Sequence, residues 1–224
     1  MAEEVGSPFL PDRGARTVRT EAGSGPSGRI AAAAAFALLL PVTGLAAALI
    51  WLMLGSPFLF RQRRSGFGGR TFMLVKLRTM SDQRDGSGVP LPDGQRLNAF
   101  GRTIRRFRFD EVPQLLSIAR GDMSWIGPRP LLPQTVAAMG ERGRMRGFVP
   151  PGLTGWAQVN GNTLLSQEEK TALDLWYAHN ASARLDLAIL FLTAATVLRG
   201  ERRHETRIAD ALAFLRWLDR AGQR

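Results

Sequence analysis

The most apolar stretch of the chain is IAAAAAFALLLPVTGLAAALIWLML, which covers residues 30–54 and contains no charged residue. A stretch of this length can cross the hydrocarbon core of a bilayer, and it exceeds the roughly 7–15 residues of a signal-peptide core. Pro41 lies in its middle, where it removes one helical hydrogen bond and favours a kink. The pattern therefore predicts a membrane helix that bends or breaks at Pro41.

Arginines flank this stretch on both sides: Arg13, Arg16, Arg19 and Arg29 before it, and Arg61, Arg63, Arg64 and Arg70 after it. Positive flanks favour the cytoplasmic side of a membrane, so a straight span would leave one set on the wrong side. A re-entrant helix that turns back at Pro41 satisfies both flanks. A kinked single span is also tolerated in membranes, and the residues alone leave both topologies open.

The remaining pattern is that of a mostly helical α+β domain with a small sheet. Residues 70–80 predict a strand, and the polar, Gly- and Pro-containing residues 81–96 predict a long exposed loop. Residues 150–161 predict an irregular segment with a short strand near Trp156 to Val159. Residues 1–28, rich in Gly, Ser, Pro and Arg, predict a disordered tail. Helical spacing of apolar residues predicts helices at 97–108, 110–120, 132–146, 166–179, 185–199 and 206–221.

Composition narrows the chemistry. The 224 residues suffice for one domain with a core, and the net charge of +11 favours an anionic partner: nucleic acid, an acidic membrane surface or a phosphorylated substrate. The absence of cysteine excludes disulfides and thiolate metal sites. With only His179 and His204 as histidines, a divalent metal would be held by oxygen ligands, which suits Mg²⁺.

Two adjacent acids, Asp110 and Glu111, follow a run of arginines in RRFRFDEVPQLL. Local preferences favour a helix start with Asp110 as the N-cap. The same position attracts phosphate, and the nearby arginines are expected to lower the pKa of Asp110. An ionised aspartate can attack phosphorus, and Glu111 can hold Mg²⁺ against phosphate oxygens.

Three basic residues are candidates for binding phosphate. Lys76 and Arg78 occupy alternate positions of the predicted strand and share one face. Arg129 lies between two prolines in GPRP, which fix the backbone and direct a bidentate guanidinium. The ordinary alternatives are the solvated side of a strand and an exposed turn.

In GLTGWAQVNG, Trp156, Gln158 and Asn160 could recognise a base or a sugar. The alternatives are core packing for Trp156 and turn formation for Asn160. The chain contains no P-loop, no dinucleotide-binding GxGxxG motif and no Ser-His-Asp spacing that would indicate a different chemistry.

Taken in order, SPFLFRQRRSGFGGRTFMLVKLRTM, RTIRRFRFDEVPQLLSIARGDMSWIGPRPLL, PPGLTGWAQVNG and EEKTALDLWYAHNASARLDLAIL resemble the bacterial sugar transferase family. These are small monotopic phosphoglycosyl transferases that begin polysaccharide and glycan assembly. The resemblance covers roughly residues 29 to 200, and DEVPQ, GDMSWIGPRP and PGLTGWAQVNG together make it specific.

The resemblance implies transfer of a sugar 1-phosphate from a nucleotide diphosphate sugar, by family habit a UDP-sugar, to polyprenol (undecaprenyl) phosphate. Asp110 would be the nucleophile that forms a covalent phosphosugar intermediate, and Glu111 would ligate Mg²⁺. Lys76, Arg78 and Arg129 match the basic positions around the phosphates. Relatives of this kind can dimerise, and no nucleic-acid partner is expected.

The family's membrane segment is a re-entrant helix broken at a Ser-Pro pair, and Pro41 matches that proline. Leu40 stands in place of the serine, and Gln167 stands where an aromatic residue is common. The implied location is the cytoplasmic face of the bacterial inner membrane, with a cytosolic catalytic domain. The implied division is a tail (1–28), a re-entrant helix (29–54), a catalytic domain (55–200) and a C-terminal amphipathic helix (201–224).

The C-terminal helix carries one apolar stripe formed by Ile208, Leu212, Leu215 and Leu218. It could lie on the membrane surface, although packing against the domain is slightly favoured.

Two other functions compete with the transferase. A membrane-tethered nucleic-acid-binding protein would explain Phe107 and Phe109 alternating with Arg106 and Arg108, but it leaves the acid pair and GPRP unexplained. An inactive scaffold for glycan enzymes would not require all five candidate site residues.

Overall fold

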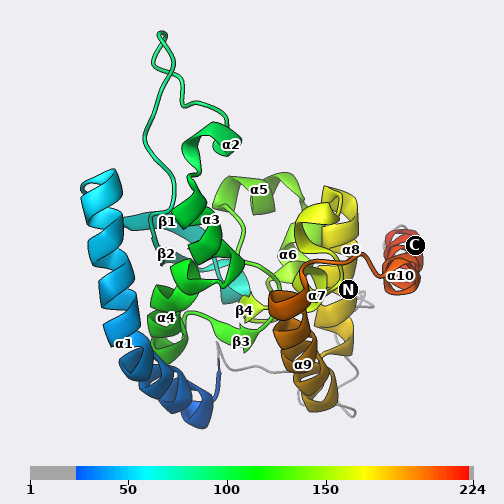
Figure 1. Cartoon of the computed structure of the whole chain (residues 1–224). Coiled ribbons are helices and arrows are strands. Elements are labelled where there is room, and N and C mark those ends of the chain that lie inside the picture. Colours follow the sequence, from blue (N-terminus) through cyan, green and yellow to red (C-terminus); the bar gives the residue numbers. More distant parts are fainter. Residues whose placement is uncertain (1–23, 222–224) are drawn as a thin grey trace.

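The computed structural model describes residues 24–221, so most of the tail predicted at 1–28 lies outside the described residues. Within that range, helices surround two small two-stranded sheets (Figure 1). The prediction of a mostly helical α+β fold with little sheet is confirmed. The tail prediction was wrong for residues 26–28, which begin the first helix.

Helix α1 (Pro26–Leu54) stays helical through Pro41, so the predicted break at this residue was wrong, and Figure 1 shows the helix curving along one side of the domain. It is the one helix within residues 24–221 that is long and apolar enough to cross a membrane. Its first half packs Ala32 onto helix α4, and its second half packs Ile50 against Leu77 and Ile104. Both halves therefore contribute to the core of the domain.

The first sheet pairs β1 (Leu59–Ser65) with β2 (Thr71–Leu77) in antiparallel fashion across the short helix η1 (Phe67–Gly69). The second pairs β3 (Ser124–Ile126) with β4 (Gly152–Thr154) in parallel. The strand predicted near Trp156 to Val159 was wrong, because the strand ends earlier and these residues form the one-turn helix α7 (Trp156–Val159). This turn brings Trp156 into the core, where it stacks on Trp176 with ring centroids 5.4 Å apart.

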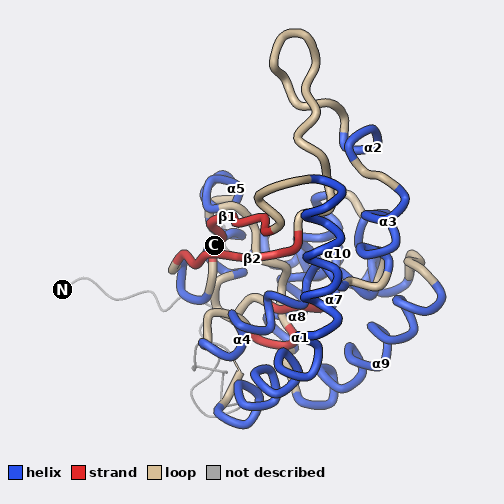
Figure 2. Tube along the Cα trace, turned by 60° about the vertical axis from the view of Figure 1, so that its left-hand side comes forward, coloured by secondary structure: helices blue, strands red, loops and turns tan. Residues whose placement is uncertain are grey.

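The polar segment predicted as a loop projects from the body and ends in α2 (Asp93–Arg96), as Figure 2 shows. Helix α3 (Ala99–Arg106) is capped by the Asn98 side chain. The predicted helix 110–120 consists of the 3-10 helix η2 (Phe109–Gln114) and α4 (Leu115–Arg120), which ends at Gly121 in the left-handed region. The single helix predicted at 132–146 was wrong: Gly140, with φ of 56°, separates α5 (Pro133–Ala138) from α6 (Glu141–Arg146).

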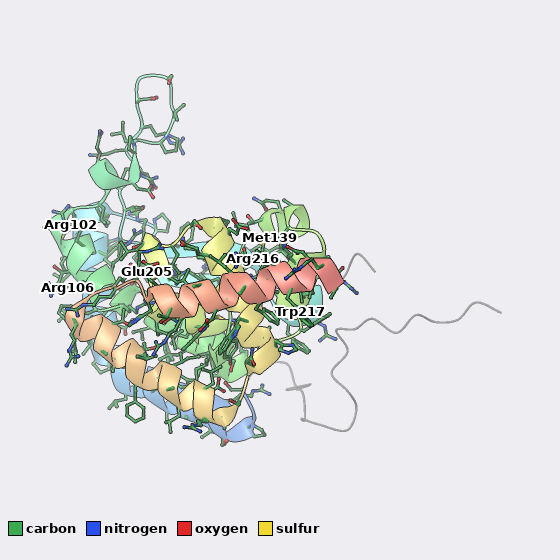
Figure 3. All side chains as sticks on the ribbon, turned by 90° about the vertical axis from the view of Figure 1, so that its right-hand side faces the viewer. Arg102, Arg106, Met139, Glu205, Arg216 and Trp217 are labelled. Carbon is green, nitrogen blue, oxygen red and sulfur yellow. The ribbon has the colours of Figure 1, made fainter. Side chains whose placement is uncertain are left out.

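Three long helices complete the fold: α8 (Gln167–Asn180), α9 (Ala183–Arg199) and α10 (Glu205–Ala221), preceded by the short η3 (Asn162–Leu164). A capping box formed by Ser166 and Glu169 starts α8. Figure 3 shows α10 lying across the domain, with Arg216 and Trp217 along it. Its buried residues Ile208, Ala211, Leu215 and Leu218 join the largest core cluster, so α10 packs against the folded domain.

Replacing Leu215 by alanine is expected to lower the free energy of unfolding by about 2–5 kcal/mol, the usual cost of a core cavity. Leu215 is 1% exposed, whereas Trp217 on the same helix is 49% exposed. Thermal unfolding of Leu215→Ala and of the control Trp217→Ala measures the difference. Equal small shifts in the two variants would mean that α10 contributes little to the core.

Candidate active site

The acid pair lies on η2, whose first residues follow an unusual turn. Arg108, just before it, has φ of 57°, a left-handed conformation that is uncommon for a residue other than glycine. Asp110 and Glu111 are 8% and 7% exposed. Asp110 lies inside the first turn and does not cap it, so the prediction of an N-cap was wrong; Arg108 occupies that position.

Glu111 is surrounded by three cations from three parts of the fold. Its Oε1 accepts from Lys76 Nζ at 2.6 Å and from Arg129 Nη2 at 3.0 Å, and its Oε2 accepts from Arg108 Nη1 at 3.3 Å. Burial opposes ionisation, but the three cations outweigh it and hold the pKa of Glu111 at about 2. The carboxylate is therefore ionised at neutral pH, and the cluster keeps an excess of positive charge.

Asp110 behaves in the opposite way. Burial and the neighbouring Glu111 charge raise its pKa, and Lys76 and Arg105 only partly offset them. The expectation that arginines lower the pKa of Asp110 was wrong in its net direction, because burial and the Glu111 charge outweigh the effect of the cations. The fold thus holds Asp110 in a partly desolvated state, which makes an ionised carboxylate more reactive toward an electrophile.

The backbone of Arg129 is held in place by Arg146, which belongs to a buried ion pair. Arg146 donates through Nη2 to the Arg129 carbonyl at 2.7 Å, and through Nε and Nη2 to Asp174 Oδ2 at 2.9 and 2.6 Å. Arg146 and Asp174 are both nearly inaccessible to solvent. The backbone between Pro128 and Pro130 is therefore held rigidly while the Arg129 guanidinium, partly exposed, reaches Glu111.

Arg78 is placed differently from Lys76 and Arg129. Its guanidinium donates to the carbonyls of Leu54 and Gly55, at the end of α1, and to Asp82 at 2.8 Å. It thus satisfies carbonyls left open by the helix terminus. Its phosphate-binding role stays a prediction, and the structure assigns it a role in anchoring α1.

Gln158 and Asn160 are buried in the interior, and neither takes part in the hydrogen bonds of the acid cluster. Asn160 donates to the Trp156 carbonyl at 2.8 Å and accepts from Arg207 at 3.1 Å. Gln158 is 2% exposed. Their proposed contact with a base or sugar stays a prediction, and any such contact would require both side chains to become accessible.

Sequence reasoning missed Arg108, Arg146 and Asp174. The position of Arg108, three residues before Glu111, could have suggested a contact in a helical turn. No local signal links Arg146 to Asp174, because 28 residues separate them and only the packing of α6 on α8 joins them.

The donor atoms near Asp110 suit a hard cation only in part. Within residues 24–221 there is no group of three or more His, Asp or Glu side chains placed to hold a metal. Mg²⁺ in phosphate sites commonly takes one or two carboxylates and completes its shell with phosphate oxygens and water. Asp110 and Glu111 fit that requirement, provided that the cations on Glu111 shift toward an incoming phosphate.

Comparison with known proteins identifies relatives of this chain. Residues 27–200 match the family model of the bacterial sugar transferases. The uncharacterised sugar transferase EpsL of Bacillus subtilis is 47% identical over 75% of this chain and 83% of its own length. The UDP-glucose:undecaprenyl-phosphate glucose-1-phosphate transferase of Caulobacter vibrioides is 37% identical over 75% of this chain and 67% of its own length.

A further relative, the undecaprenyl-phosphate glucose phosphotransferase of Komagataeibacter xylinus, is 40% identical over 69% of this chain, which spans only 32% of that longer protein. The family match covers the acid pair, Lys76, Arg129 and nearly all of α1, and it ends where α9 ends. The resemblance seen in the motifs is thereby confirmed. The chain belongs to the bacterial sugar transferase family.

Proposed function

We propose that this protein transfers a sugar 1-phosphate from a UDP-sugar to undecaprenyl phosphate and so initiates assembly of a polysaccharide. The observation that carries the proposal is the pairing of a desolvated Asp110 with a cation-saturated Glu111 in one buried turn. Two polyanionic substrates need such a positive cluster, and a phosphoryl transfer needs a nucleophile beside it. The name of the Caulobacter relative supports both substrates, and the name of the Komagataeibacter relative supports the undecaprenyl-phosphate acceptor.

The reaction proceeds in two displacements at one phosphorus atom. A carboxylate oxygen of Asp110 attacks the phosphorus that bears the sugar, and the bond to the bridging oxygen breaks. UMP leaves with that electron pair, and an acyl phosphate links Asp110 to the sugar phosphate. An oxygen of undecaprenyl phosphate then attacks the same phosphorus, the bond to Asp110 breaks, and the free carboxylate returns. Neither step requires a proton transfer.

The remaining residues stabilise charge. Lys76 and Arg129 now share Glu111 Oε1, and both can transfer to phosphate oxygens when the donor enters. Glu111, relieved of these partners, would hold Mg²⁺ together with the donor's phosphates. When bound, Mg²⁺ neutralises negative charge on the phosphate oxygens and on the departing UMP.

Intact-protein mass spectrometry tests the covalent step. The detergent-solubilised protein is incubated with Mg²⁺ and a panel of UDP-sugars, without acceptor. We expect a mass gain equal to one phosphosugar, located on the peptide that contains Asp110 and removed by undecaprenyl phosphate. UMP release without any adduct, or an adduct on another residue, would contradict the mechanism.

We propose further that α1 lies within one leaflet with both of its ends at the cytoplasmic face, which keeps the catalytic domain at that face. The catalytic domain packs along both halves of α1, so a perpendicular span would draw α3 and α4 into the hydrocarbon region. Side chains on the opposite face of α1, including Leu38, Leu45 and Leu52, are 64–80% exposed and apolar. Helix α9 also exposes apolar side chains, namely Leu187, Leu190, Phe191 and Leu198.

Cysteine labelling distinguishes the two topologies, because the chain contains no cysteine of its own. Gly25→Cys and Arg61→Cys place single thiols at exposed positions before and after α1. A membrane-impermeant maleimide should label neither variant in spheroplasts and both in inverted membrane vesicles. Labelling of Gly25→Cys in spheroplasts would instead establish a spanning helix.

A further inference from the structure

A cavity of about 200 Å³ is lined in part by Arg129, the residue that also contacts Glu111. It is formed where the turn between β1 and β2 meets the GPRP loop, α5 and α6. Gly68 N donates to the Gly147 carbonyl at 2.9 Å and joins two of these walls. Gly143 lets α6 approach α5, since a Cβ at this position would lie 2.1 Å from the Val136 carbonyl oxygen. The cavity is therefore built by the fold.

The lining does not suit a sugar. Ser65 carries the only hydroxyl among the lining side chains, and none of these side chains is an amide or a carboxylate. A hexose has several hydroxyls, each of which needs a hydrogen-bond partner when buried. Most of the wall is apolar, contributed by Pro128, Pro130, Val136, Phe148, Val149 and Pro151.

The same lining does suit a flat heterocycle. Phe148 is 39% exposed, so its ring is available to a ligand, and the Arg144 guanidinium carbon lies 5.9 Å from its centroid. Aromatic rings and guanidinium groups are the surfaces on which proteins stack nucleobases. The polar edge of a base can be satisfied by backbone groups of the glycine-rich lining other than the N–H groups of Gly66, Gly68 and Gly147, which already donate to protein carbonyls.

Arg129 connects the cavity to the reacting group. Arg129 lines the cavity, and its Nη2 lies 3.0 Å from Glu111 Oε1. A nucleotide whose base occupies the cavity would therefore carry its diphosphate past this guanidinium toward Asp110. Gln158 and Asn160, the residues that the motif suggested for this task, are buried elsewhere and do not line the cavity.

We propose that this cavity holds the nucleoside of the donor, with Arg129 on the diphosphate between the base and Asp110. The inference rests on the proposed function, because a nucleotide diphosphate sugar is the ligand that needs such a subsite. It assigns nucleotide selection to Phe148 and Val136, whereas the sugar lies beyond the acid pair, outside the cavity.

The first test fills the cavity. Val136→Trp occupies the space of the base, and Ala137→Trp adds the same side chain at a neighbouring exposed position that does not line the cavity. Binding of UMP, measured by calorimetry on the solubilised full chain, should weaken at least about tenfold in Val136→Trp and stay near the wild-type value in Ala137→Trp.

The second test removes the stacking surface from a partly exposed site, where folding is least at risk. Phe148→Ala should weaken UMP binding about 5- to 150-fold, the range expected for one lost base-stacking contact. Binding of ribose 5-phosphate, which has no base, should not change. Together these outcomes support the nucleoside subsite.

Wild-type UMP affinity in both Val136→Trp and Phe148→Ala would overturn the subsite. If the phosphosugar adduct on Asp110 still forms under those conditions, the proposed function stands and only the location of the nucleoside is wrong. Equal weakening of UMP and ribose 5-phosphate in Phe148→Ala would also overturn it, since the loss would then not involve the base.

Discussion

Asp110→Asn should abolish the phosphosugar adduct and lower turnover by at least about 10³-fold, as expected for the loss of a covalent nucleophile. The amide keeps the shape of the carboxylate but has no charge and no nucleophilic oxygen. The three cations bonded to Glu111 remain, so UMP binding should change little. UMP release and adduct mass, measured on the same samples, separate the chemical step from binding.

The same substitution should leave the protein as stable as the wild type or more so. The pKa of Asp110 is raised in the folded state, so the fold binds a proton more tightly than the unfolded chain does. Ionised Asp110 therefore costs stability, and this cost grows as pH rises from the unfolded pKa through the folded one. Asparagine removes the cost, and thermal unfolding at neutral pH measures the gain.

Asp93→Asn is the matched control, because it makes the same chemical change at a side chain that is 80% exposed and lies outside the cluster. It should retain wild-type turnover. If Asp110→Asn releases UMP at the wild-type rate while folded, Asp110 is not the nucleophile, and a direct transfer between the two substrates replaces the two-step mechanism.

Arg146→Ala should lower the free energy of unfolding by about 3–5 kcal/mol, the usual cost of leaving a buried charge without its partner. Asp174 would lose both guanidinium contacts in an environment that already raises its pKa through burial. For a protein of this size the melting temperature should fall by about 6–20 °C. Turnover should fall as well, because the Arg129 carbonyl loses the donor that fixes it.

The pH dependence identifies the cause. Without Arg146 the folded pKa of Asp174 rises further above the unfolded value, so stability decreases as pH rises through that interval and recovers on acidification. The double variant Arg146→Ala/Asp174→Asn should regain much of the loss. A single variant that is no less stable than the wild type would show that the ion pair is dispensable.

The sequence was most informative where one local interaction decides the structure. Helical spacing of apolar residues located the long C-terminal helices to within a few residues. The acid pair and Arg129 came together as the motifs implied. By contrast, the raised pKa of Asp110 depends mainly on its burial and on the neighbouring Glu111 charge, and the burial is produced by tertiary packing.

Where the sequence-based predictions were wrong, tertiary contacts determined the structure instead. Trp156 was expected in a strand, yet its stacking on Trp176 outweighs its preference for extended structure. Arg78 was expected in the same strand as Lys76, but it lies just after that strand, and the end of a helix offers it carbonyl partners that only the folded chain brings near. Neither partner lies close enough in the sequence to be read from it.

The packing of α1 has a consequence for protein engineering. Removal of α1 would expose Ile118, Met123, Leu77 and Ile104 to solvent, because all four side chains are buried against it. A truncated chain should therefore aggregate instead of giving a soluble enzyme. A water-soluble version would have to keep the side chains that face the domain, such as Ala32 and Ile50. Only the side chains that face away from it, for example Leu38, Leu45 and Leu52, could be replaced by polar residues. Helix α1 is therefore an integral part of the folded domain and cannot be removed as a separate membrane anchor.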